Sequence, residues 1–504
     1  MLAKVKTASI LGLNGIAVEV EVDIRNGLPA FNIVGLPDKA VQESKERVIS
    51  AIKNSDAFIP TKKIIVNLAP ADLPKEGPSY DLPIAVGLLA AAGQVSVNFD
   101  KQLFVGELAL DGSLRFTNGI LPVADFAKKS GIEELFVPMQ NANEAALIPG
   151  LNVIPVKNIA QLVLHLRGEE KLESFVSSPG TLDLETENPS SDLKYVKGQL
   201  QAKRALEIAA AGGHNILMSG TPGSGKTMLA RCMPSILPQM TVTESLDVTR
   251  IYSVAGILPQ NTPLIKIRPF RKPHHTISNV ALVGGGRIPK PGEISLAHRG
   301  VLFLDEFPEF SNQVLETLRQ PLEDRIVTIS RAAGTLTFPA NFMLVAAMNP
   351  CKCGWKGDPE KECTCLPSQI QRYQKKISGP ILDRIDLQVF VHRVKYDNLQ
   401  KDDLAESSAE VYKRVQSARD IQAVRFKNSR IICNGEMGTK EIGIYCKLSN
   451  GCKKLLRTAA ERFNLSARAY FRIIKVSRTI ADLESAEEIQ EHHISEALQY
   501  RLGA

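Results

Sequence analysis

The chain has 504 residues, which is too long for one hydrophobic core, so we expect about two to four domains. Its composition, 44% hydrophobic and 23% charged, is typical of a soluble globular protein. No apolar run reaches the roughly 18–20 residues of a membrane span, and the first residues lack a secretory signal, so we expect a cytoplasmic protein without a membrane partner. Eight cysteines then indicate thiols or a metal rather than disulfides. The net charge of +7 permits a polyanionic partner without predicting one.

Residues 1–168 alternate strand-like and helix-like patterns and predict an α/β domain that has no phosphate loop. The strand-like patterns cover residues 16–22, 64–68 and 103–110, and the helix-like patterns cover residues 40–55 and 82–92. Residues 169–192 follow, with seven acids, one lysine and several proline and glycine breakers. Because such a segment buries little apolar surface, we predict that it is a flexible linker.

Residues 193–395 predict a second α/β domain, and this one contains the motif that says most about function. Residues 220–227 read G-x-x-x-x-G-K-T, with an apolar strand at 216–219 before them and a helix-forming segment after them. The glycines allow backbone N–H groups to point at phosphate oxygens, Lys226 can reach the β and γ phosphates, and Thr227 can ligate Mg²⁺. We therefore predict that ATP and Mg²⁺ bind to Gly220, Thr221, Pro222, Gly223, Ser224, Gly225, Lys226 and Thr227.

Two further apolar strands end in polar residues that suit hydrolysis. Residues 300–304 lead into Asp305, which is predicted to hold Mg²⁺, and Glu306, which is predicted to polarise the attacking water. Residues 342–347 lead into Asn349, whose amide is predicted to orient the same water. The alternative for Asn349 is the start of a turn, since it precedes a proline.

Arg384 is a candidate for contact with the γ-phosphate of a neighbouring subunit. It follows a Ser-Gly-Pro break, and an arginine offered in this way offsets charge that develops during phosphoryl transfer. The alternative is an ion pair with Asp383 or Asp386 on its own surface.

Residues 396–504 predict a charged helical domain, with long periodic stretches at 455–463 and 466–483. Arg468 opens the second stretch and is predicted to reach the phosphates from this helical lid. Arg472 and Arg478 lie on the same helix and remain alternatives.

Four cysteines form two C-x-C pairs that are separated by nine residues. The intervening loop contains glycine and proline, so the pairs can close on each other, and four thiolates favour tetrahedral Zn²⁺. We predict a structural zinc site at residues 351–365, and the alternative is four reduced, partly exposed thiols. The ligands would be Cys351, Cys353, Cys363 and Cys365.

The order of these motifs resembles the AAA+ ATPases, and within them the magnesium-chelatase-like branch and its ComM/YifB subfamily of competence proteins. The resemblance covers the whole chain except the linker, and it is carried by residues 31–48, 197–230, 268–278, 292–306 and 466–483. It implies an AAA+ nucleotide domain with a C-terminal helical lid, assembled as a homo-hexameric ring. It also implies a DNA helicase that drives branch migration during natural transformation, with branched or single-stranded DNA as its partner. A magnesium-chelatase-type motor that serves metal insertion is the alternative.

The N-terminal domain is similar to Lon proteases in two segments. Residues 74–79 resemble the segment that bears the catalytic serine, here Ser79, and the chain from residue 104 resembles the strand that follows. Where Lon proteases carry the catalytic lysine, residues 119–122 read Gly-Ile-Leu-Pro, and the nearest lysines are Lys128 and Lys129. A serine–lysine pair needs the lysine beside the serine, so we predict a Lon-like fold without peptidase activity.

Two basic stretches are candidates for DNA contact. Residues 268–278 contain two arginines, a lysine and two histidines, and residues 325–335 predict a β-hairpin with Arg331 near its turn. In related ring ATPases, insertions at these places line the central pore, where they would contact phosphates. Solvated loops or subunit contacts are the alternative, and His274 and His275 are weak candidates for metal ligands.

Overall fold

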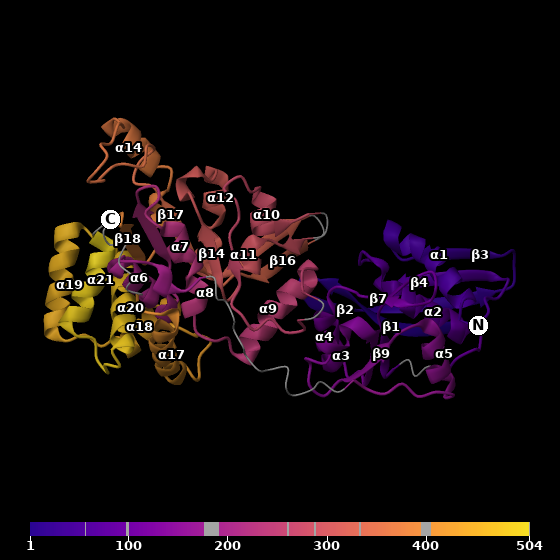
Figure 1. Cartoon of the computed structure of the whole chain (residues 1–504). Coiled ribbons are helices and arrows are strands. Elements are labelled where there is room, and N and C mark those ends of the chain that lie inside the picture. Colours follow the sequence, from indigo (N-terminus) through magenta and orange to yellow (C-terminus); the bar gives the residue numbers. More distant parts are fainter. Residues whose placement is uncertain are drawn as a thin grey trace. The chain divides into compact units, whose positions relative to one another are not determined.

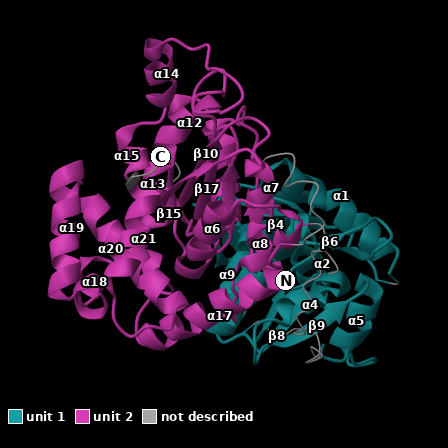
Figure 2. Ribbon diagram, turned by 60° about the vertical axis from the view of Figure 1, so that its left-hand side comes forward, with its two compact units in different colours: residues 1–184, 242–265 teal, residues 185–241, 266–504 magenta. Residues whose placement is uncertain are grey.

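The computed structural model describes residues 1–55, 57–96, 100–175, 191–259, 262–286, 289–331, 334–394 and 405–502 (Figure 1). The chain divides into two compact units, one of residues 1–184 with 242–265 and one of residues 185–241 with 266–504 (Figure 2). Most of the predicted linker, residues 176–190, lies outside the described residues. Among the described helices, none has the length and apolar character to cross a bilayer.

The first unit is built on a seven-stranded mixed sheet. In spatial order its strands are β3 (Ala30–Val34), β4 (Lys63–Ala69), β2 (Asn14–Arg25), β1 (Leu2–Leu11), β5 (Gln102–Phe104), β8 (Glu134–Pro138) and β9 (Asn152–Val156). The pairs β1–β2 and β2–β4 are antiparallel, and the other pairs are parallel. Alternating burial along β2 and β4 shows that one face of each strand packs against the core.

Helices α1 (Lys39–Lys53), α2 (Asp81–Ala91), α3 (Ile120–Lys129), α4 (Ala142–Ala145) and α5 (Ile159–Arg167) complete the fold of this region. Every residue of α2 is buried, which agrees with its apolar composition on all sides. The single strand expected at residues 103–110 is divided into β5 and β6 (Glu107–Leu108), because β6 pairs with β7 (Leu114–Arg115) in a separate hairpin.

Helix α9 (Val242–Ala255) lies in the first unit although it interrupts the chain of the second. It packs against α3, where Arg250 contacts Asp125 at 3.1 Å. The Ser253 hydroxyl donates to the carboxylate of Glu144 at 2.5 Å, and burial raises the pKa of that carboxyl group. A segment of the predicted 193–395 domain therefore completes the first unit.

The second unit contains a five-stranded parallel sheet. In spatial order the strands are β11 (Phe270–Arg271), β14 (Val301–Leu304), β17 (Met343–Met348), β10 (Ile216–Gly220) and β18 (Leu387–Val391). All residues of β14 and β17 are buried, as expected for central strands of a parallel sheet. Because the strands run in one direction, the loops after β10, β14 and β17 leave the same edge.

The helices α6 (Leu200–Gly212), α7 (Lys226–Arg231) and α8 (Met233–Ile236) surround the phosphate-loop strand. The C-terminal region, orange to yellow in Figure 1, contains α17 (Ser408–Arg425), α18 (Thr439–Tyr445), α19 (Asn450–Phe463), α20 (Ala467–Leu483) and α21 (Glu491–Leu502). Helices α17 and α20 pack against α6, α21 packs against β18, and α18 and α19 pack on α20 and α21, respectively. The predicted boundary at residue 396 lies outside the described residues, but the helical character of this region is confirmed.

The second unit also contains several short elements outside its five-stranded sheet. They are α10 (Asn279–Val283), β12 (Gly284–Gly285), β13 (Lys290–Pro291), α11 (Glu293–Leu296), α12 (Asn312–Thr317), α13 (Arg319–Asp324), β15 (Ile326–Arg331), β16 (Gly334–Pro339), α14 (Pro367–Gln374) and α15 (Gly379–Leu382). Strands β15 and β16 pair antiparallel from Ile326 with Pro339 to Arg331 with Gly334, which confirms the predicted hairpin. Its turn, residues 332–333, lies outside the described residues.

Candidate functional site

The phosphate loop joins β10 to α7 in the conformation that its glycines make possible. Gly223 and Gly225 have φ values of 76° and 93°, and an added Cβ at either would meet no atom within 4 Å. Open space therefore lies above the loop where phosphates would bind. The Ser224 hydroxyl is buried and has no hydrogen-bond partner among the described residues, which leaves a polar atom for a ligand.

Lys226 is folded back onto the loop. Its Nζ donates to the carbonyl oxygens of Gly220 at 2.7 Å and Thr221 at 2.9 Å, and it lies 3.3 Å from Oδ1 of Asn349. Burial lowers the pKa of Lys226 to about 8, since desolvation disfavours the charged ammonium. Phosphate oxygens would compete directly with these acceptors, so the residues present fit a nucleotide phosphate.

Thr227 and Asp305 lie together as a magnesium site requires. The Thr227 hydroxyl donates to Oδ2 of Asp305 at 2.9 Å, so the two oxygens can face one cation. Nζ of Lys272 lies 3.1 Å from the same carboxylate oxygen and supplies positive charge there. The donor set of one hydroxyl and one carboxylate fits Mg²⁺.

Glu306 follows β14 in a left-handed backbone conformation, with φ of 52°. This conformation is unusual for a residue other than glycine, and such residues occur often at functional sites. The carboxylate is more than half exposed, and Oε2 lies 3.2 Å from Nδ1 of His275. The side chain is therefore open to water while one neighbour fixes its direction.

Lys272 and His275 were not among the predicted site residues. Their segment was predicted to contact DNA, whereas both side chains face the acidic pair after β14. Their position could have identified them, because they follow β11, which is the edge strand beside β14. His274, in contrast, contacts the hydroxyl of Thr276 at 2.8 Å.

The two arginines of the same segment are held inside the unit. Nε and Nη2 of Arg271 donate to the carboxylate of Glu293, at 2.6 and 2.7 Å. Arg268 donates to the carbonyl oxygens of Pro238 at 2.6 Å and Arg299 at 2.7 Å. These contacts hold residues 268–278 in place. Lys272 and His275 are the residues of this segment that contact Asp305 and Glu306.

Arg384 and Arg468 come from distant parts of the chain and contact one carboxylate. Nη2 of Arg384 pairs with Oε2 of Glu323, and Nη2 of Arg468 lies 3.2 Å from Oε1 of the same residue. The alternative partners considered for Arg384 are engaged elsewhere, since Asp383 contacts Arg501 and Asp386 pairs with Arg472.

The other two arginines of α20 are positioned differently from Arg468. Arg472 pairs with Asp386, whose pKa is held far below its usual range by Arg472 and His214 against the effect of burial. Arg478 is buried and donates to Asp482 at 2.9 Å. Arg468 is thus the exposed arginine of the three that were considered, with 56% of its side chain accessible.

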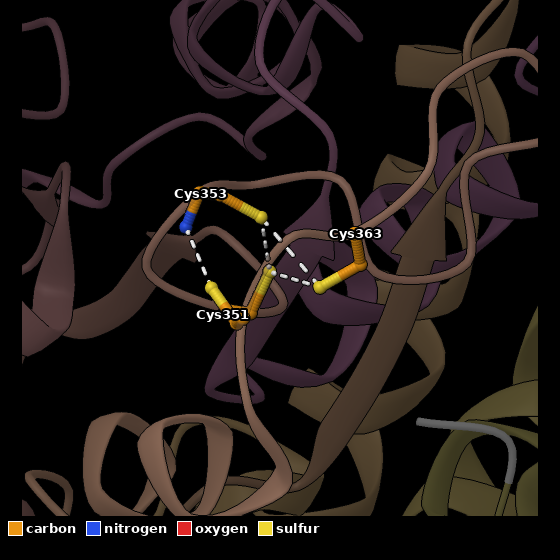
Figure 3. Close-up of side chains that lie close together, drawn as sticks. Cys351, Cys353 and Cys363 are labelled. Atoms are coloured by element: carbon orange, nitrogen blue, oxygen red, sulfur yellow. Dashed lines mark hydrogen bonds between the residues drawn. The ribbon is translucent and has the colours of Figure 1, made fainter.

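The four cysteines of residues 351–365 converge. Sγ of Cys351 lies 3.4 Å from Sγ of Cys353 and 3.6 Å from Sγ of Cys363, and the last two are 3.6 Å apart (Figure 3). The Sγ atoms of all four, including Cys365, lie within 4.8 Å of one another. Tetrahedral zinc with Zn–S bonds of about 2.3 Å sets sulfur atoms roughly 3.8 Å apart, so the set fits Zn²⁺.

The cysteine loop lies against the phosphate loop. A Cβ built on Gly354 would be 2.6 Å from Cγ and Cδ of Pro222, so only glycine permits this approach. A further residue absent from the sequence prediction is Gln199, whose amide donates to the carbonyl of Ser224 at 3.1 Å and to the carbonyl of His392. The loop is thus supported on two sides by polar contacts and close packing.

The serine of the first unit has no comparable surroundings. Lys75, four residues before Ser79, donates to the Pro70 carbonyl, and the two lysines nearest to residues 119–122 also have other partners: Lys128 donates to the Gly150 carbonyl and Lys129 to Asp125. The carboxylate of Asp81, two residues after Ser79, is buried and pairs with Arg47 at 2.6 Å. These contacts engage the lysines considered as a base for Ser79 with other partners.

Comparison with known proteins agrees with this geometry along the chain. Residues 192–399 match the family model of the magnesium chelatase subunit ChlI, residues 405–501 match that of the ChlI C-terminal region, and residues 20–141 match a further model of subunit ChlI. The fold and the site define a AAA+-type nucleotide-binding protein, and the chain belongs to the magnesium-chelatase-like family, in its ComM/YifB subfamily.

Two relatives extend over almost the whole chain. The competence protein ComM of Haemophilus influenzae is 46% identical over 510 residues, which cover 99% of this chain and 97% of the relative. YifB of Salmonella typhimurium is 44% identical over 507 residues, with the same coverage of each chain. A Lon protease of Mycoplasmopsis agalactiae is 25% identical over 191 residues, 35% of this chain and 19% of the relative. Family membership indicates ATPase activity with ATP and Mg²⁺.

Proposed function

We propose that this chain is an ATP-hydrolysing motor that acts on DNA as a homo-hexameric ring and drives branch migration. The observation that carries the ATPase part is the convergence of Lys226, Thr227, Asp305, Glu306 and Asn349 at one edge of a parallel sheet. The DNA part is supported by full-length similarity to a competence protein.

In this proposal each residue has a defined task. Lys226 and the loop N–H groups bind the phosphates, while Thr227 and Asp305 hold the metal that offsets phosphate charge. Glu306, which His275 orients, accepts the proton of the attacking water, and Asn349 fixes the position of that water. Arg384 of a neighbouring subunit and Arg468 of the lid offset the charge that develops on the γ-phosphate.

The test is ATP hydrolysis by the full chain with no DNA, with linear duplex and with a four-way junction, together with strand exchange on that junction. We expect junction DNA to raise turnover and to be converted to duplex products. Glu306→Gln protein, purified identically, controls for contaminating ATPases. Unchanged turnover together with no binding of either DNA would contradict the proposal.

A magnesium-chelatase-type motor, which would remodel a metal-insertion complex, is the second candidate, and the family models favour it. This second candidate predicts that DNA does not change the rate of ATP hydrolysis. It also predicts that the motor needs separate partner chains. For the first unit we propose a Lon-like fold without peptidase activity, supported by the partners of Lys75, Lys128 and Lys129.

We also propose that Cys351, Cys353, Cys363 and Cys365 hold a structural Zn²⁺. Their Sγ atoms lie within 4.8 Å of one another, so one ion can contact all four sulfur atoms. Metal analysis of the purified protein is expected to give one zinc per chain, lost in Cys353→Ser. Full zinc content in that variant would contradict the site.

A further inference from the structure

One carboxylate holds both arginines that are proposed to act on the γ-phosphate. Glu323 lies at the end of α13, and its two oxygens contact Nη2 of Arg384 and Nη2 of Arg468. Residues 384 and 468 are far apart in sequence, so this carboxylate brings the turn before β18 and the first turn of α20 to one point. Glu323 itself is half exposed.

The guanidinium of Arg384 is held within its own chain in this arrangement. Nη1 donates to the Pro380 carbonyl at 2.7 Å, Nη2 pairs with Glu323, and Nε is buried without a hydrogen-bond partner among the described residues. A guanidinium binds phosphate through parallel N–H groups. Because Arg384 is only 8% exposed and Glu323 offsets its charge, Arg384 has to leave Glu323 before it can present such a pair to a nucleotide of another subunit.

Glu323 is also tied to the β15–β16 hairpin. Only Asp324 and Arg325 separate it from β15, and α13 packs against that strand. Nη1 of Arg325 lies 3.7 Å from Oε2 of Glu436, in the loop between α17 and α18, which joins the base of the hairpin to the helical region. A displacement of the hairpin thus moves the carboxylate that holds the two arginines.

We propose that Glu323 is a positioning residue that acts as a latch on ATP hydrolysis. In the isolated subunit it keeps Arg384 and Arg468 paired within the chain, and a phosphodiester strand that displaces the β15–β16 hairpin releases them. That the ligand is a DNA strand rests on the proposed function. The latch itself rests on the contacts of Glu323 with the two arginines.

The test replaces the carboxylate by its neutral isostere in the full chain. For Glu323→Gln we expect DNA-free turnover to rise about fivefold or more, and the factor by which junction DNA stimulates turnover to fall toward one. In an Arg384→Ala background, Glu323→Gln is expected to give no gain over Arg384→Ala alone, which would show that the gain acts through Arg384. Glu461→Gln, which removes the exposed Arg457–Glu461 pair on α19, is the matched control and should behave as the parent.

DNA-free turnover of Glu323→Gln at or below that of the parent, with an unchanged melting temperature, would overturn the latch. If that variant does not fold, Glu323→Asp decides the question, since the shorter side chain cannot reach both arginines and should also raise DNA-free turnover. A parent protein that DNA does not stimulate contradicts the proposed function alone, because the DNA-free rates still test the latch.

Discussion

Within the second unit, the residues around the phosphate loop and the two predicted arginines differ in how completely a single chain positions them. We call these groups the phosphate-loop side and the arginine side. On the first side, Lys226 contacts Asn349 and Thr227 contacts Asp305 at the edge of the sheet. On the second side, Arg384 and Arg468 face Glu323. A single chain thus forms a nucleotide-binding surface, whereas its two predicted arginines pair with Glu323. We therefore expect that a substitution can abolish ATP turnover without abolishing ATP binding.

Removal of the carboxylate on the assembled side should have the largest effect. For Glu306→Gln we expect turnover to fall by about ten-thousandfold, because general base catalysis supplies up to a factor of that order. Binding of ATP should stay near that of the parent, since Glu306 contacts His275 and not the phosphate loop. Single-turnover hydrolysis and equilibrium nucleotide binding measure the two effects. Retained turnover would show that another group activates the water.

Loss of Arg384 should lower turnover nearly as severely, and it tests the arginine side of the second unit. For Arg384→Ala we expect turnover to fall by about a thousandfold, the lower range found for arginine fingers, with ATP affinity unchanged. Steady-state kinetics and nucleotide binding distinguish this from a folding defect. If affinity is lost in parallel with turnover, Arg384 contacts nucleotide within its own subunit or supports the fold.

A change of pH should produce a smaller effect, confined to the phosphate-loop side. Burial lowers the pKa of Lys226 to about 8, whereas bound phosphate favours the charged ammonium. Binding at pH 8 should therefore take up protons, and ATP affinity should weaken about tenfold between pH 7 and pH 9 as the free protein loses this charge. Titration calorimetry in two buffers of different ionisation enthalpy measures both. Constant affinity without proton uptake would contradict the assigned position of Lys226.

The predictions for the phosphate-loop side rest on local information in the sequence. Strand patterns at 216–219, 300–304 and 342–347 each end in polar residues, and parallel strands bring their carboxyl ends together. The structure places the residues that follow these strands within hydrogen-bonding distance, as the spacing predicts.

The arginine side could not be predicted in the same way. Sequence proximity suggested Asp383 or Asp386 for Arg384, but the partner is Glu323, sixty-one residues away. Likewise, the sequence assigned residues 242–255 to the predicted 193–395 domain, and the structure packs the helix that they form, α9, on α3 of the first unit. Charge and amphipathicity show that a side chain or helix needs a partner, whereas the tertiary fold decides which partner it finds.

Mixing two variants that are each inactive tests the central claim most directly. Glu306→Gln supplies Arg384 but no base, and Arg384→Ala supplies the base but no arginine. If the site is completed between subunits, equimolar mixtures should recover a substantial fraction of parental ATP hydrolysis, because some interfaces then contain both groups. Mixtures that remain as inactive as the separate variants, although the subunits co-assemble, would contradict the account.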